Sequence, residues 1–451
     1  MRALALAAAV TGAVASAALP LAAHANGNHA HEAISLRAVA HLPPGPLKAL
    51  LQAPDLQQAL MNGTFFPDGG YVIGHGYGET AHWEPYQRAL LAHLGKAHPA
   101  LEKDPAARPK LAFLFGMFSH GMADQVYDAL FMEAGKHYDK AGWSDDLFTS
   151  FDTATDVFWV AQAGASPMPE PWLPMDDLRA VFQARGEPVP EATLTDAQQT
   201  LAKVILGWPK LKAESKEGIA DLRQRYPWAW DHLSDPHEPG NPLCEARVVA
   251  AYWQGVWDEL HGKPAQLRVL ATVPSEGAAH PWPAKVTPQS TLAVVLSRGL
   301  DAAKLADDAV TVRDAKGNKL PAKQHLFYGQ NSNVVRLLPA SDWPVGHKLT
   351  LRVAKGIVAF DGTVGAAEES FAFTVGAGPQ REPGLPPKGS PWQLAAPPPQ
   401  AQTPTTAADS GTGGCATGGR PAGAPAVRWT LLVAWMVLTR RRWSGGTSHA
   451  Q

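Results

Sequence analysis

The spacing of apolar residues divides the chain into a part with the pattern of helices and a part with the pattern of strands. Up to about residue 262, apolar positions recur at intervals of three and four, as in PLKALLQAPDLQQALMNG and EPYQRALLAHLGKAH, which predicts amphipathic helices. From about Pro264, apolar and polar residues alternate, as in AVTVRDAKGNKLPAKQHLFYG, which predicts short strands and turns. We therefore expect a multidomain protein in which an all-α domain precedes an all-β sandwich.

The two ends of the chain differ from these parts in composition. Residues 1–25 join one arginine to a run of Ala, Val and Leu that ends in Ala-His-Ala. This is the pattern of a secretory signal peptide, with a membrane anchor as the alternative. Residues 376–414 are rich in Pro, Ala and Thr, which is typical of an extended linker. Residues 415–451 contain a short apolar run followed by three arginines, and that run is short for a membrane span.

The charge balance argues against a nucleic-acid partner. The chain has 39 Lys and Arg against 41 Asp and Glu, a formal net charge of -2. Proteins that bind phosphate backbones usually carry a basic excess, so no nucleic-acid binding is expected.

One apolar segment carries three ionisable residues on one predicted helix face. In FLFGMFSHGMADQVYDAL, His120, Asp124 and Asp128 are four residues apart, and residues at that spacing stack along one side of an α-helix. Their neighbours are apolar, so the three side chains are predicted to be buried. Two buried carboxylates side by side are costly unless a positive charge lies between them, and a metal ion would supply it.

Further candidate ligands occur in three other segments. Asp152 and Asp156 are again four apart in SFDTATDVFWV, and Asp68 follows a proline in a predicted Pro-Asp-Gly turn. His82 is predicted at a helix start, and His31 lies close to the predicted cleavage site. Each has an ordinary explanation by itself, such as a core histidine, a turn aspartate or a solvated carboxylate. Together, four separate groups of His and Asp in one helical domain indicate a shared metal site.

The order of these motifs resembles the zinc-dependent phospholipase C family. Four motifs follow one another within about residues 30–160. They are His-Glu near the predicted mature start, FPDGG, His-Trp and FLFGMFSHGMAD. The arrangement is similar to the catalytic domain of glycosylphosphatidylinositol-specific phospholipase D, and more distantly to zinc-dependent single-strand nucleases. The resemblance implies a helical domain that binds two or three Zn²⁺ ions and hydrolyses phosphodiesters, above all phospholipid head groups.

Carried across residue by residue, the resemblance implies a set of metal ligands. They are His31, Asp68, His82, His120, Asp124, Asp128, Asp152 and Asp156. Asp68, predicted to lie in a loop, is the candidate bridging ligand or catalytic base. The family has histidines near Leu36 and at Asp128, and this chain does not. Because imidazole suits zinc and carboxylates suit harder ions, another divalent ion is the alternative cofactor.

Aromatic residues and the C-terminal half add further expectations. Tyr71, Tyr77 and Trp83 are candidates for the border of a substrate pocket. TVRDAKGN and LTLRVAKGIVAFDGT resemble bacterial Ig-like domains, which implies spacing or adhesion. Gly-Cys415, a short apolar segment and terminal arginines resemble a myxobacterial C-terminal sorting tag. That resemblance implies a processing protease acting at Cys415 and surface anchoring; a weak membrane tail with an incidental cysteine is the alternative.

These observations combine into one predicted organisation. The segments are a signal peptide (1–25), a phospholipase C-like domain (26–263), an Ig-like sandwich (264–375), a linker (376–414) and a sorting tag (415–451). The predicted function is that of a secreted or surface-anchored, metal-dependent phosphodiesterase that acts on phospholipids at a membrane surface. One alternative is a nuclease on the same scaffold, which the charge argues against. The other is a non-catalytic, metal-binding adhesion protein, which the missing histidines favour.

Overall fold

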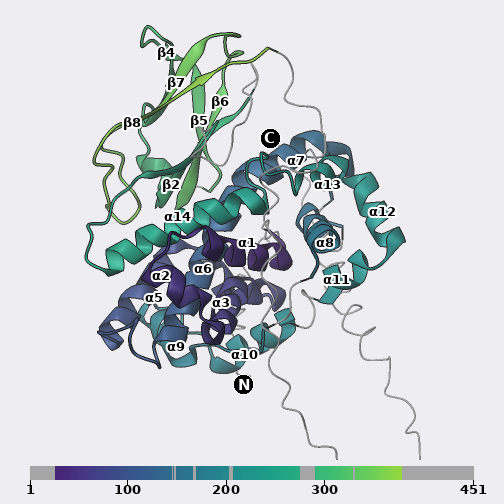
Figure 1. Ribbon diagram of the computed structural model, residues 1–451, viewed down its shortest axis with the longest axis vertical. Coiled ribbons are helices and arrows are strands. Elements are labelled where there is room, and N and C mark those ends of the chain that lie inside the picture. The colour runs from purple at the N-terminus through teal and green to yellow at the C-terminus, as the bar shows by residue number, and fades with distance from the viewer. Residues whose placement is uncertain are drawn as a thin grey trace, which may run out of the picture. The chain divides into compact units, whose positions relative to one another are not determined.

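Helices joined by short loops make up the first part of the protein (Figure 1). The computed structural model describes residues 26–144, 146, 149–165, 169–202, 207–274, 290–328 and 331–377. The predicted signal peptide, almost all of the predicted linker and the predicted sorting tag lie outside these residues. The α-helices are α1 (Asn28–His41), α2 (Pro46–Gln52), α3 (Pro54–Val72), α4 (Tyr77–His82), α5 (Glu84–Ala97), α6 (Arg108–Val126), α7 (Glu133–Tyr138), α8 (Phe151–Ala163), α9 (Met175–Ala184), α10 (Glu191–Thr200), α11 (Gly207–Ala213), α12 (Lys216–Arg225), α13 (Pro227–His232) and α14 (Pro242–Leu260). Within the described residues, none of these helices is both long enough and apolar enough to cross a bilayer.

Helix α6 is a buried helix, as its apolar sequence predicts. Every residue from Leu111 to Val126 is buried, and the helix continues into a π-helical turn, η1 (Tyr127–Met132). A π-turn holds more residues per turn than an α-helix, and such turns often occur at functional sites. The residues after Val126 are therefore rotated relative to the face that carries His120 and Asp124.

Asp68 lies inside helix α3, so the prediction that it sits in a turn was wrong. The helix continues through Pro67 to Val72, although an internal proline costs about 3 kcal/mol. Close packing of α3 on α6 offsets that cost. A Cβ built on Gly63 would lie 1.8 Å from the carbonyl oxygen of Phe113, and one built on Gly116 would lie 2.1 Å from that of Leu60. The two backbones therefore touch, and only glycine allows that approach.

In the part of the chain that the structure describes, two four-stranded antiparallel sheets follow the helices. Their strand orders are β1-β2-β6-β5 and β4-β3-β7-β8. The strands are β1 (Val269–Val273), β2 (Leu292–Leu300), β3 (Val310–Arg313), β4 (Lys319–Leu320), β5 (Ala322–Leu326), β6 (Ser332–Pro339), β7 (Lys348–Val353) and β8 (Glu369–Thr374). The predicted order of helices first and strands second is confirmed.

Strand β2 in the first sheet is buried on both faces. All residues of β2 are buried, and successive side chains of a strand point to opposite faces. Leu292 and Val294 belong to the hydrophobic cluster formed between the sheets, whereas Ala293 and Val295 belong to the cluster formed by the helices. Strand β6 packs against α6, and β1 packs against α14. The helical and sheet parts therefore share a core.

Candidate metal centre

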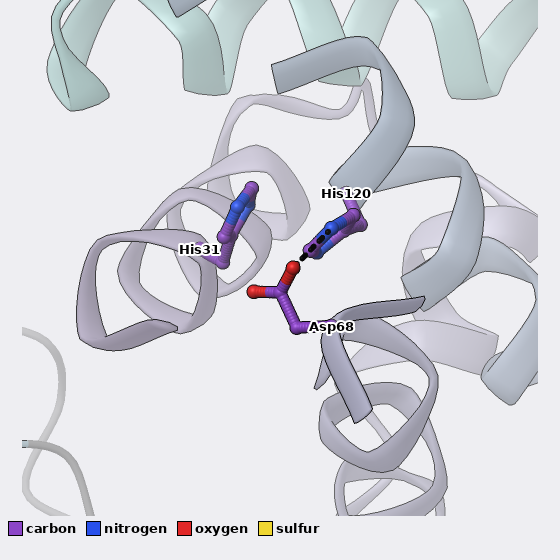
Figure 2. Close-up of side chains that lie close together, drawn as sticks. All are labelled: His31, Asp68 and His120. Carbon is purple, nitrogen blue, oxygen red and sulfur yellow. Dashed lines mark ion pairs between the residues drawn. The ribbon is translucent and has the colours of Figure 1, made fainter. Parts of the chain in front are cut away.

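Five of the predicted ligands converge from four helices. Helix α1 supplies His31, α3 supplies Asp68, α4 supplies His82 as its last residue, and α6 supplies His120 and Asp124. They form two overlapping groups, His31 with Asp68 and His120, and His82 with His120 and Asp124. Within each group the ligand atoms all lie within 4.8 Å of one another. Figure 2 shows His31, Asp68 and His120 meeting from separate segments of the chain.

Asp124 lies next to all three histidines of this cluster. Its Oδ1 lies 2.9 Å from Nε2 of His31, and its Oδ2 lies 3.2 Å from Nε2 of His120 and 3.6 Å from Nε2 of His82. Asp68 closes the other side, with Oδ1 at 3.2 Å from Nε2 of His82 and 3.6 Å from Nε2 of His120. The rings of His31 and His120 stack with centroids 4.0 Å apart. All five side chains therefore surround one small volume.

Backbone carbonyls fix the tautomers of two of the histidines. Nδ1–H of His82 donates to the carbonyl oxygen of Gly78 at 2.6 Å, and Nδ1–H of His120 donates to that of Thr64 at 2.7 Å. In a neutral imidazole the other nitrogen then carries a lone pair. The two Nε2 atoms lie only 2.9 Å apart between two carboxylates, so their lone pairs face each other when both rings are neutral. A shared cation removes that repulsion.

Hydroxyl groups hold the three helices in register beside the cluster. The hydroxyl of Ser35 on α1 donates to Oγ of Ser119 on α6 at 2.8 Å, and it lies 3.0 Å from Oγ1 of Thr64 on α3. All three residues are buried. Ser119 precedes His120, and Thr64 supplies the carbonyl that orients His120. These hydroxyl contacts hold the helices that carry His31, Asp68 and His120 in place and so position the ligands. Hydrogen-bonding groups around the ligands of metal sites commonly have this role.

Burial and missing hydrogen bonds both indicate that the cluster can hold a metal ion. The side chains of His31 and His120 are 0% exposed, that of Asp124 is 1% exposed, and that of Asp68 is 12% exposed. Neither oxygen of Asp124 and neither ring nitrogen of His31 has an aligned hydrogen bond, despite the short distance between them. Buried polar atoms without partners are costly. Imidazole and carboxylate at these positions suit a divalent cation.

The electrostatics of the cluster keep its carboxylates ionised. Burial raises the pKa of Asp68 and Asp124, but the neighbouring histidines outweigh it, so both values lie below the usual range. Burial lowers the pKa of His120, and His31 lowers it further. For His82, burial also acts to lower the pKa, but Asp68 and Asp124 raise it above the usual value. The carboxylates are therefore in the anionic state that binds cations, and a cation bound at His82 would displace the proton that its raised pKa favours.

The other three predicted ligands lie outside the two groups. Asp128, on the π-helical turn, accepts a hydrogen bond from the hydroxyl of Tyr328. Burial, followed by the charges of Asp124 and Asp152, raises its pKa well above the usual value. Asp156 accepts from the backbone N–H of Ala30 at 3.1 Å and so fastens α8 to the start of α1. Asp152 lies in the first turn of α8. Helical spacing therefore identified these residues but not their contacts.

Aromatic residues border the cluster, and one of them comes from the sheet part. The ring centroid of Trp83 lies 5.8 Å from that of His82, and the centroid of Tyr71 lies 4.7 Å from it. Tyr328 packs on Trp83 with centroids 4.5 Å apart. Tyr77 is only 3% exposed and belongs to the helical core instead. Sequence reasoning missed Tyr328 because nothing in the HLFYG segment except an aromatic pair after a strand marks it.

The chain is similar over a limited stretch to a phospholipid-cleaving enzyme. Phosphatidylinositol-glycan-specific phospholipase D of Bos taurus is 34% identical over 104 residues, which is 21% of this chain and 12% of that protein. The Rattus norvegicus protein of the same name is 36% identical over 93 residues, 19% of this chain and 10% of that protein. The match therefore spans about a tenth of the length of these curated relatives. No protein-family model matches the chain.

Similarity to solved structures is weak. The S-layer protein rSbsC(31-844) aligns with 78% of this chain and 46% of its own at 10% identity and a TM-score of 0.20. The N-terminal part of the bacterial S-layer protein SbsC aligns with 73% of this chain and 79% of its own, also at 10% identity and a TM-score of 0.20. Scores this low carry no argument about the fold or the location of this protein.

Proposed function

We propose that the chain is a metal-dependent phosphodiesterase that hydrolyses phospholipid head groups in the manner of a phospholipase C. The observation that carries the proposal is the pair of Nε2 atoms of His82 and His120, 2.9 Å apart between Asp68 and Asp124, with both Nδ1 atoms already committed to carbonyls. Such an arrangement favours a bound cation. The partial likeness to a phospholipase D points to phospholipid-related hydrolysis.

His31, Asp68, His82, His120 and Asp124 would hold the cation or cations. A divalent ion supplies Lewis acidity and a bound water of lowered pKa. Zn²⁺ is favoured by the three imidazoles, and the two carboxylates leave other divalent ions as alternatives. Two ions would share His120 between the two overlapping groups, and a third would require further ligands such as the more distant aspartates.

Asp68 is the proposed catalytic residue of the chain itself. It is the most exposed of the five side chains at 12%, so it faces the side from which a substrate would approach. Burial acts to raise its pKa, but the neighbouring histidines outweigh burial and hold the pKa below the usual range, so its carboxylate is ionised and can accept a hydrogen bond. His120 and Asp124, at 0% and 1% exposure, would bind and orient rather than contact substrate.

A non-catalytic metal-binding protein is the second candidate function. The near-complete burial of His31, His120 and Asp124 favours it, because a buried centre is also what a structural metal site needs. Hydrolysis by the purified protein separates the two functions.

Export, surface anchoring and an Ig-like sandwich are parts of the same proposal. A signal peptide at residues 1–25, a linker and a sorting tag processed at Cys415 would place the enzyme at a membrane surface, with a processing protease as a partner. Two packed antiparallel sheets are compatible with an Ig-like arrangement. Recovery of the mature protein from the cell surface, with its N-terminus read by mass spectrometry, tests the export and anchoring.

The test of the function uses the protein purified without chelators. Bound metal is counted by elemental mass spectrometry, and hydrolysis is followed on phosphatidylcholine and phosphatidylinositol vesicles. A phospholipase C-like reaction releases diacylglycerol, and a phospholipase D-like reaction releases phosphatidic acid. Metal present without lipid hydrolysis supports the non-catalytic candidate. Cleavage of single-stranded DNA instead of lipid supports a nuclease. Fewer than about one ion per chain refutes the metal centre itself.

A further inference from the structure

We infer that Tyr328, supplied by the sheet part of the chain, is a substrate-contacting residue that helps to determine specificity at the candidate metal centre. The inference rests on the proposed function and extends it. The sheet part would then belong to the hydrolytic unit and would not act only as a spacer or an adhesion module.

Tyr328 is held against the helix that carries His120 and Asp124. It lies between β5 and β6, and its hydroxyl donates to Asp128, one turn after Asp124. The following strand is fastened to the same helix through Gln125. The side-chain amide of Gln125 donates to the carbonyl oxygen of Asn331 at 2.5 Å and accepts from the backbone N–H of Asn333 at 2.9 Å. This double bridge fixes Tyr328 beside the centre.

Buried charges fix the sheet part near His82 as well. Arg298 on β2 is 2% exposed and lies 3.4 Å from Glu84, which begins helix α5 two residues after His82. The backbone N–H of Gly299 donates to the second oxygen of Glu84 at 3.1 Å. Arg298 also lies 2.5 Å from Glu259 on α14. The sheet is therefore tied to the helices on two sides of the cluster, and these contacts place Tyr328 beside it.

The partly exposed aromatic side chains form a rim around buried polar groups. Tyr71, Trp83 and Tyr328 are each half-buried, whereas the ligand side chains are buried. Tyr328 packs on Trp83, and Trp83 and Tyr71 both adjoin His82.

The chemistry of the rim favours a substrate with an apolar or ring-shaped group next to its phosphodiester. Tyr71 donates to one carboxylate oxygen of Glu79 at 2.5 Å, and Nε1–H of Trp83 donates to the other at 2.8 Å. Glu79 is exposed, so the rim has aromatic faces and one negative charge. Aromatic faces pack on apolar groups, and the negative charge disfavours a polyanion such as single-stranded DNA.

The experiment compares Tyr328→Phe, Tyr328→Leu and Tyr328→Ala with a control variant in the full chain. The control is Tyr138→Ala, which removes a 49% exposed tyrosine that stacks on Trp228 away from the cluster. Each protein is assayed for bound metal, thermal unfolding, and hydrolysis of phosphatidylcholine vesicles and of bis(p-nitrophenyl) phosphate, a small soluble diester. Binding of dihexanoylphosphatidylcholine is measured by calorimetry, which needs no turnover.

We expect Tyr328→Ala to keep its metal and to lose about tenfold or more in kcat/KM on vesicles, chiefly through KM. Its activity on the soluble diester should change much less. Tyr328→Phe keeps the ring and should stay near the wild type on both substrates, and Tyr328→Leu should fall between them. Equal losses on both substrates, or loss of metal in Tyr328→Ala and Tyr328→Leu, would show a structural role and overturn the inference.

Failure of the proposed function has a different signature. If the wild type hydrolyses neither substrate, the hydrolase proposal falls, and the calorimetric measurement decides the inference alone. Weaker binding of the short-chain lipid by Tyr328→Ala but not by Tyr138→Ala then supports Tyr328 as a contact. Equal binding by all variants, or no binding by the wild type, overturns it.

Discussion

The direct contact between helices α3 and α6 gives the sharpest test of how the centre is built. Gly116→Ala adds one methyl group where α6 crosses α3. That Cβ would lie 2.1 Å from the carbonyl oxygen of Leu60 and 2.6 Å from the backbone nitrogen of Thr64. Both neighbours are backbone atoms, which cannot rotate away. The helices must therefore separate by about 1 Å to restore normal contact distances.

The consequence for the centre follows from the positions of its ligands. Asp68 lies on α3 beyond the crossing, and His120 lies one turn after Gly116 on α6. Oδ1 of Asp68 is 3.6 Å from Nε2 of His120, so a separation of about 1 Å takes Asp68 out of reach of a shared ion. Overpacking should cost about 1–3 kcal/mol of unfolding free energy, and displacement of this size lowers a rate by about a hundredfold.

The assay pairs Gly116→Ala with Gly95→Ala, which adds a methyl group where nothing lies within 4 Å. Gly95 is inside helix α5, so its replacement should stabilise the protein by up to about 1 kcal/mol. Urea unfolding, metal content and hydrolysis are measured for both variants and the wild type. If Gly116→Ala unfolds at the wild-type urea concentration and keeps the wild-type metal content, the backbone contact does not position the ligands.

Three further predictions test other parts of the structure. Asp124→Asn should lose at least one ion. Because ion binding stabilises only the folded state, a chelator should lower the Tm of the wild type but not of this variant. Unchanged metal content in Asp124→Asn would contradict the assignment of Asp124 as a ligand. Arg298→Met should cost about 2 kcal/mol in urea unfolding, because Glu84 and Glu259 lose one of two arginine partners and keep Arg88; a cost under about 0.5 kcal/mol would show that Arg88 alone compensates both carboxylates. The pKa of His41 is lowered from 6.5 to about 4 by burial and by nearby positive charges. The folded state therefore resists protonation, and stability falls as the pH drops from 6.5 towards 4. The full effect is about 3 kcal/mol, reduced by partial exposure to about 1 kcal/mol, and His41→Gln should lose that much less between pH 7 and pH 4 in urea titrations.

The local pattern of residues in the sequence was sufficient to predict several features of this protein. The change from a helical to an alternating period near Pro264 matches the order of helices and strands, because side-chain periodicity follows directly from backbone geometry. The pairing of His120 with Asp124 also followed from spacing, since both lie on one face of a regular helix. His31, Asp68 and His82 were recognised by motif, and the structure brings them to the same cluster.

Tertiary contacts alone determined the conformation around Asp68 and the partners of the ionisable residues. Asp68 is helical because α3 packs on α6 through two glycines, which outweighs the local preference of Pro-Asp-Gly for a turn. Asp128 meets Tyr328 and Asp156 meets Ala30, partners that lie 200 and 126 residues away along the chain. A sequence pattern carries the periodicity of one element, whereas the contact between two elements depends on how both pack in the same core. For that reason the ionisable residues could be named in advance, but their partners could not.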